Sequence, residues 1–145
     1  MKVVKASMIS LSILPLLLGV HVAQAEKEPQ HLYEAAQASP ALKSAFEKIM
    51  APVVKDSSWL GSYGTTAPPT VETLDNVDYN VYWGCKPHDC ISESYVVMYD
   101  PKSKDIVAGA FVRNTFDGPN VIKGETTWLG KTDWDKAKVL GKYLY

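Results

Sequence analysis

The chain has 145 residues, 46% of them hydrophobic, with two cysteines and a formal net charge of −1. This length is typical of one domain with one ordinary core. The near-neutral charge and the lack of a basic stripe argue against a nucleic-acid-binding protein.

The first 25 residues have the features of a secretory signal peptide. A short basic start, residues 1–5, precedes an apolar run at residues 6–20, which is shorter than the roughly 20 residues of a membrane span. Ala23-Gln24-Ala25 supplies the small-x-small cleavage pattern. An uncleaved anchor helix is the less favoured alternative. We therefore expect cleavage after residue 25, a single periplasmic or extracellular domain at residues 26–145, and no membrane anchor.

Two helices are predicted in the first part of this domain, a short one at residues 32–38 and a longer one that begins at Ser39-Pro40. Serine suits the N-cap and proline the first helical position. Apolar residues then follow at helical spacing: Leu42, Ala45, Phe46, Ile49 and Met50. Pro52 is expected to limit the length of this helix.

The pattern then changes to strands. Residues 56–69 are expected to form a loop that Trp59-Leu60 pins to the core. Asp75-Asn76 suits a two-residue hairpin turn. Residues 77–83 alternate as a half-buried strand, with Val77, Tyr79, Val81 and Trp83 on one side and Tyr82 on the other.

Two further strands are expected at residues 94–99 and 106–113, with Gly109 as a bulge. Residues 115–124 are expected to form a loop around Gly118-Pro119-Asn120, and residues 125–129 a short strand.

Thr132 is the predicted N-cap of a last helix that extends to about residue 141 and buries Trp134, Ala137 and Leu140. The sum is an α+β domain, in which a central antiparallel sheet of about five strands has flanking helices.

Cys85 and Cys90 are both in the exported part, where an oxidising compartment favours a bridge between them. A disulfide requires Cα atoms roughly 5.5 Å apart, whereas five extended steps would cover roughly 17 Å. The segment must therefore fold back into a tight, protruding loop between two strands, and Pro87 stiffens it.

Other interpretations of this segment remain open at this point. A purely structural bridge between neighbouring strands is the default. A zinc site lacks ligands, since the exported part has only His31 besides His88 and no third cysteine. A redox motif needs Cys-x-x-Cys spacing, and a Cys–His nucleophile pair needs a free thiol.

The unbroken string CKPHDC at residues 85–90 resembles the inhibitory loop of the Ivy family, the inhibitors of vertebrate lysozyme. Looser matches lie at residues 43–46, 79–81, 97–99 and 127–129. The resemblance covers most of residues 26–145, but only the CKPHDC string is specific.

This resemblance implies a periplasmic inhibitor of C-type lysozyme that serves evasion of host defence, has no cofactor or metal, and catalyses nothing. It implies that the loop enters the lysozyme cleft and that its histidine, His88, meets the two catalytic carboxylates. Cys85 and Cys90 would form the bridge, while Lys86, Pro87 and Asp89 would shape the loop. It also implies endogenous lytic transglycosylases as further partners, and a homodimer in some members.

Two other functions compete with inhibition: a periplasmic glycan-processing enzyme and a small-ligand or metal-binding module. The enzyme lacks a convincing acid pair, because Asp133 and Asp135 are better explained as first-turn acids of a helix. The four tryptophans are expected in the core rather than on a sugar-stacking platform. His31 is expected to be solvated, and Gly61-Ser62-Tyr63-Gly64 to be only a turn.

Overall fold

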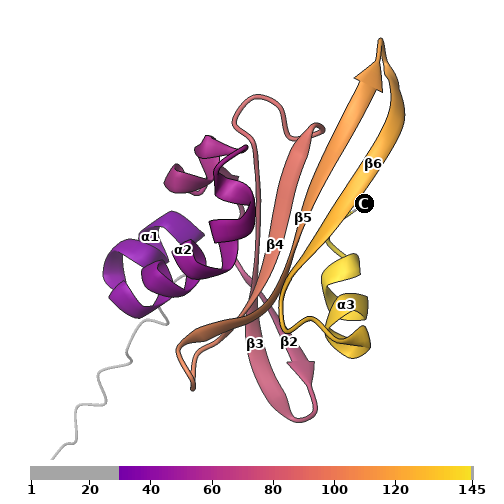
Figure 1. Cartoon of the computed structure of the whole chain (residues 1–145). Helices are drawn as coiled ribbons and strands as arrows, with labels where there is room; N and C mark the ends of the chain where they lie inside the picture. Colours follow the sequence, from indigo (N-terminus) through magenta and orange to yellow (C-terminus); the bar gives the residue numbers. More distant parts are fainter. Residues whose placement is uncertain (1–29, 145) are drawn as a thin grey trace, which may run out of the picture.

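The computed structural model describes residues 30–144, which form an antiparallel sheet with helices on both faces (Figure 1). The predicted signal peptide, residues 1–25, lies outside the described residues. The described part of the chain contains no helix of the length and hydropathy that a membrane span requires. The predicted α+β class is confirmed, with six strands where about five were expected.

The elements in chain order are α1 (Leu32–Ala38), α2 (Pro40–Val54), η1 (Ser58–Ser62), β1 (Thr65–Thr66), β2 (Thr70–Leu74), β3 (Val77–Cys85), β4 (Glu93–Asp100), β5 (Asp105–Asp117), β6 (Asn120–Gly130) and α3 (Trp134–Gly141). The sheet order is β1-β3-β4-β5-β6, and β2 pairs with β3 on the same edge as β1. All pairs are antiparallel, so the β3–β4 loop and the β5–β6 turn project from the same end of the sheet (Figure 1).

The sheet separates two hydrophobic cores. Helices α1 and α2 cover one face, and α3 covers the other (Figure 1). Alternate residues of β3 therefore enter different cores, with Tyr82 under α2 and Val81 under α3. The expectation of a half-buried β3 with Tyr82 facing solvent is wrong, because the alternation of apolar and polar residues does not reveal that a second helix covers the other face.

Helix α2 begins as predicted, since Ser39 Oγ accepts a hydrogen bond from Leu42 N and Pro40 is the first helical residue. The expected stripe is buried on the sheet side. Pro52 does not end the helix, which continues to Val54. A proline this near the end removes only one intrahelical hydrogen bond, and the final turn stays helical.

The β2–β3 hairpin is confirmed, with Asp75 and Asn76 at positive φ of 52° and 60°, as a type I′ turn requires. The predicted bulge at Gly109 is wrong. Gly109 pairs regularly with Val97, whereas the register between β4 and β5 shifts at Met98/Tyr99.

The segment at residues 115–124 is not the expected loop. β5 and β6 continue through it as a hairpin, closed by a turn at Gly118-Pro119. The loop was predicted because Gly118, Pro119 and Asn120 are typical turn residues. The residues on either side of them include β-branched and aromatic side chains, which favour strands.

The last helix is capped by Asp133, one residue later than predicted, because Asp133 accepts a hydrogen bond from Lys136 N at 3.0 Å. The Thr132 hydroxyl instead donates to the carbonyl of Leu129. Trp134 is 76% exposed, contrary to the prediction that the helix buries it. It precedes the buried Leu140 by six residues, about 120° from it around the helix axis.

Candidate functional site

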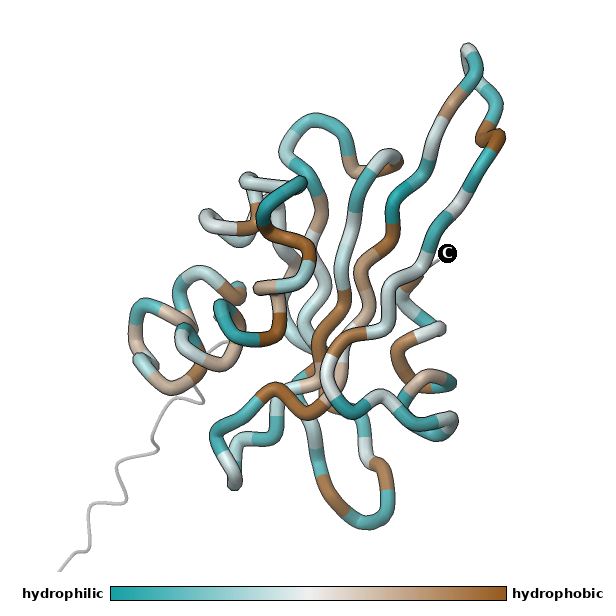
Figure 2. Tube along the Cα trace, in the orientation of Figure 1, coloured by the Kyte–Doolittle hydropathy of each residue, from teal (hydrophilic) through white to brown (hydrophobic). Residues whose placement is uncertain are grey.

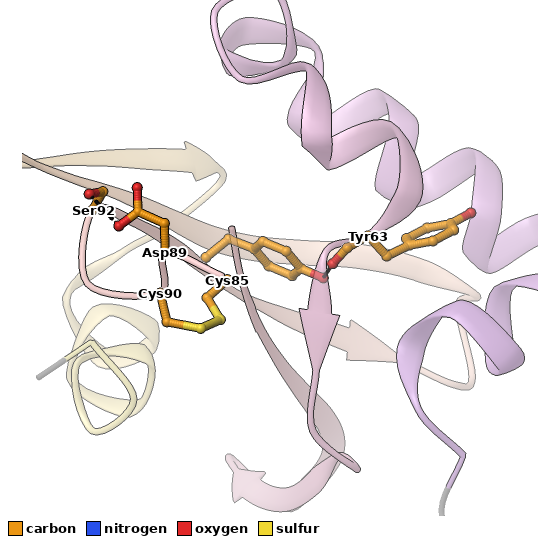
Figure 3. Close-up of a disulfide and its surroundings, with 6 residues drawn as sticks. Tyr63, Cys85, Asp89, Cys90 and Ser92 are labelled. Carbon is orange, nitrogen blue, oxygen red and sulfur yellow. Dashed lines mark hydrogen bonds between the residues drawn. A yellow bond between two sulfur atoms is a disulfide. The ribbon is translucent and has the colours of Figure 1, made fainter. Parts of the chain in front are cut away.

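The loop between β3 and β4 is closed by a disulfide between Cys85 and Cys90, as expected (Figure 3). The two Cα atoms are 4.8 Å apart. Cys85 is the last residue of β3 and is fully buried, whereas Cys90 is exposed. The bridge therefore fastens the exposed half of the loop to a fixed point in the sheet.

Within the ring, residues 86–89 form a tight turn. Asp89 N donates to the carbonyl of Lys86 at 3.0 Å. Proline fixes the φ angle at the second position, and His88 at the third position has a positive φ of 63°, as a type II turn requires. Histidine is among the non-glycine residues that tolerate this left-handed conformation. The local sequence thus places His88 at the outer corner of the turn.

The two charged side chains of the loop bind within it. Lys86 Nζ lies 3.0 Å from Asp89 Oδ2. Ser92 Oγ donates to Asp89 Oδ1 at 2.7 Å (Figure 3). The hydrogen bond from Ser92 and that from Lys86 hold the pKa of Asp89 below its usual range. Asp89 is therefore an ionised internal brace of the loop.

Pro87 and His88 remain as the exposed side chains at the tip of the turn. The imidazole has no hydrogen bond among the described contacts of the loop, in contrast to Lys86 and Asp89. The site thus presents one rigidly placed imidazole, which can donate from both ring nitrogens when protonated.

A buried polar cluster, which the sequence analysis did not predict, supports the base of this loop. Glu93, whose side chain is 12% exposed, accepts hydrogen bonds from Trp59 Nε1, Ser57 Oγ and Arg113 Nε. Its own carbonyl accepts from Lys86 N at 3.0 Å. These residues are distant in the sequence and come together only when η1 and β5 pack beside β4.

The cluster keeps Glu93 ionised. Burial raises the pKa of the Glu93 carboxyl, but the hydrogen bonds from Trp59, Arg113 and Ser57 outweigh burial and leave the pKa below its usual value. Charge-assisted bonds of this kind are stronger than neutral ones.

Glu93 should make the protein less stable in acid. Its pKa is lower in the folded state than in the unfolded chain, so its contribution is complete above the unfolded value of about 4.5 and is lost as the pH falls through the folded value. We expect the urea concentration at the midpoint of unfolding to decrease as the pH is lowered below about 4.5. This decrease should be smaller in Glu93→Gln than in wild type. Glu47→Gln is the matched control, because Glu47 is 59% exposed on the outer side of α2, and its acid slope should equal that of wild type. An equal acid slope in wild type and Glu93→Gln would contradict this prediction.

Tyr95 on β4 packs against the end of β3 that carries Cys85. Its ring is fully buried, and its hydroxyl donates to the carbonyl of Tyr63 at 2.8 Å (Figure 3). The residue opposite Tyr95 on β3 is Gly84, where an added Cβ would lie 2.5 Å from the tyrosine Cζ. The glycine is therefore required by the close approach of the ring, directly beside Cys85.

Several other residues that the sequence analysis discussed lie outside the disulfide loop. His31 is not solvated as expected, because it is partly buried and its Nδ1 lies 2.7 Å from the carbonyl of Thr66. Trp128 and Trp134 are exposed, contrary to the expectation that all tryptophans are core residues. Trp128 is on the edge strand β6, which has a neighbour on one side only. Within residues 30–144, no group of three or more His, Cys, Asp or Glu side chains is placed to hold a metal ion.

Comparison with known proteins gives a family match. A family model described as "Inhibitor of vertebrate lysozyme (Ivy)" matches residues 41–130. The chain is 35% identical over 91 residues to proteins named "Inhibitor of vertebrate lysozyme" from Escherichia coli strain K12 and from Escherichia coli O157:H7. The match covers 63% of this chain and 55% of each relative, so the chain spans about half the length of the curated relatives it matches.

Proposed function

The chain belongs to the Ivy family of inhibitors of vertebrate lysozyme, and on that premise we propose that it inhibits a C-type lysozyme by inserting residues 85–90 into the catalytic cleft. His88 is the residue that occupies the cleft, and the protein itself catalyses nothing. The observation that carries this proposal is the exposed His88 at the corner of a turn that a disulfide and several hydrogen bonds hold rigid.

The chemistry of the target suits an imidazole. Retaining glycosidases use two carboxyl groups only about 5 Å apart, one with a raised pKa and one ionised. An imidazole that donates from both nitrogens meets both groups at once and excludes the sugar ring. Because the loop is rigid before binding, little conformational entropy is lost when it docks.

The proposal also includes the cellular location of the protein, its biological role and its partners. A periplasmic location rests on the signal-peptide pattern at residues 1–25, and evasion of host defence on the family resemblance. The names of the relatives support lysozyme as the partner. Lytic transglycosylases as partners, and a homodimer, stay predictions from the resemblance.

The direct test is a lysis assay with purified protein. We expect the clearing of a bacterial suspension by a C-type lysozyme to stop at a near-stoichiometric ratio of inhibitor to enzyme. Undiminished lysis in the presence of a tenfold excess of folded protein would overturn the proposal.

Removing the disulfide should weaken inhibition more than it weakens the fold. The ring has only six residues, so the bridge contributes about 2 kcal/mol to stability. In the double variant Cys85→Ala/Cys90→Ser, the loop keeps its hydrogen bonds but gains freedom that binding must remove. We expect a folded protein that inhibits at least tenfold less well, measured by titration against lysozyme together with thermal unfolding. Unchanged potency would show that the bridge has no role in docking.

A further inference from the structure

The outer part of the β5–β6 hairpin, residues 115–123, projects beyond the rest of the sheet (Figure 1). β4 begins at Glu93, which pairs with Arg113, so past this point β5 has only β6 as a neighbouring strand. We call this segment the arm. A two-stranded ribbon cannot bury both of its faces against itself.

The arm exposes large apolar side chains near its tip. Val121 is 56% exposed and Ile122 is 64% exposed. Hydrophobic stretches interrupt the otherwise polar outer hairpin (Figure 2). Across from the arm, Ile91 in the disulfide loop is 68% exposed. Apolar residues that are grouped at one projecting end of a small domain indicate a contact surface.

Two hydrogen bonds fix the base of the arm to the disulfide loop. Asn114 N donates to the carbonyl of Ser92, and Asn114 Nδ2 donates to the carbonyl of Ile91, both at 2.8 Å. Asn114 lies directly before the arm, while Ile91 and Ser92 directly follow Cys90. The loop and the arm are therefore held in a set relation to one another.

The area that a stable complex needs points to a single partner for both features. A standard protein–protein interface buries about 800 Å² on each side, which a six-residue loop cannot supply alone. A globular enzyme that receives His88 in its cleft must lie over the end of the sheet from which the arm projects (Figure 1). The arm projects from the same end of the sheet as the loop and exposes apolar side chains, so it can complete the contact.

We propose that Val121 and Ile122 of the arm, together with Ile91, pack on apolar surface at the rim of the same lysozyme cleft that receives His88. This inference rests on the proposed function. The arm adds affinity outside the catalytic centre, and it favours those lysozymes whose rim offers apolar surface to Val121 and Ile122.

The test compares Val121→Ser/Ile122→Ser with wild type by measuring association and dissociation rates on immobilised lysozyme. We expect at least tenfold weaker binding, mostly through faster dissociation, and unchanged thermal unfolding because the side chains are exposed. Val71→Ser is the matched control. Val71 is 62% exposed on β2, which forms the hairpin at the opposite end of the sheet, and its replacement should leave binding unchanged (Figure 1).

The outcomes separate this inference from the proposed function. If the wild type inhibits lysozyme and the arm variant binds equally well, the arm inference is wrong and the proposed function stands. If the wild type binds no lysozyme, both are overturned. If the variant binds lysozyme equally well, and the wild type is a dimer whereas the variant is a monomer, the arm contacts a second copy of this chain. The inference is then also wrong.

Discussion

Replacing His88 with alanine should remove most of the inhibition of lysozyme while leaving the fold intact. His88 is exposed at the tip of the loop, and the disulfide and the Lys86–Asp89 pair that shape the turn do not involve its ring. The ring would be the only group of the loop that meets the catalytic carboxylates. Loss of a desolvated, charge-assisted contact at the centre of an interface costs about 3 kcal/mol, or roughly a hundredfold in affinity.

A second variant separates the ring from its backbone conformation. His88 has a positive φ of 63°, which alanine adopts at a cost of about 1 kcal/mol, whereas asparagine tolerates it. His88→Asn should therefore keep the turn and still lose inhibition, as judged by lysis assays and thermal unfolding. Full potency in His88→Asn would mean that the shape of the loop, and not the imidazole, blocks the enzyme.

Introducing a methyl group at Gly84 should be strongly destabilising. The new Cβ would lie 2.5 Å from the Tyr95 ring, which is fully buried and packs against Phe46 and Trp59. Overpacking of a core costs up to about 3 kcal/mol, and displacement of the tyrosine would also break its hydrogen bond to Tyr63. We expect the free energy of unfolding, measured with urea, to fall by about 3 kcal/mol.

Two controls identify the cause of this loss. Gly61→Ala adds the same methyl group at a position with no heavy atom within 4 Å, so its stability should remain within about 0.5 kcal/mol of wild type. Tyr95→Phe removes the hydroxyl without adding volume and should cost about 1 kcal/mol. If Gly84→Ala were no worse than Gly61→Ala, the close approach of the tyrosine ring would not matter for stability.

The elements that the sequence predicted well are those with local signals. Ser39-Pro40 marks the start of α2, and Asp75-Asn76 marks the β2–β3 turn, because each depends on the backbone of a few adjacent residues. The predictions failed where a distant segment decides the outcome. Tyr82 is buried because α2 covers its face, and the arm continues as strands because β5 pairs with β6 through the turn at Gly118.

The candidate site also has one part that the local sequence predicts and another part that depends on distant segments. The ring from Cys85 to Cys90 is contiguous, so its composition and spacing are visible in the sequence. The Glu93 cluster draws on η1, β4 and β5, and no spacing rule links Trp59 or Arg113 to Glu93 before the fold is known. The sequence therefore indicates the part that would touch a partner, but not the part that holds it in place.

The division of the sheet between two cores has a consequence for how such a protein can change its target. Substitutions on either face disturb packed side chains under α2 or α3. Residues 86–90 of the ring and the outer hairpin belong to neither core, so both can be exchanged while Cys85 and the scaffold stay in place. New binding specificities could therefore be grafted, or could evolve, at this one end while the rest of the sequence stays the same.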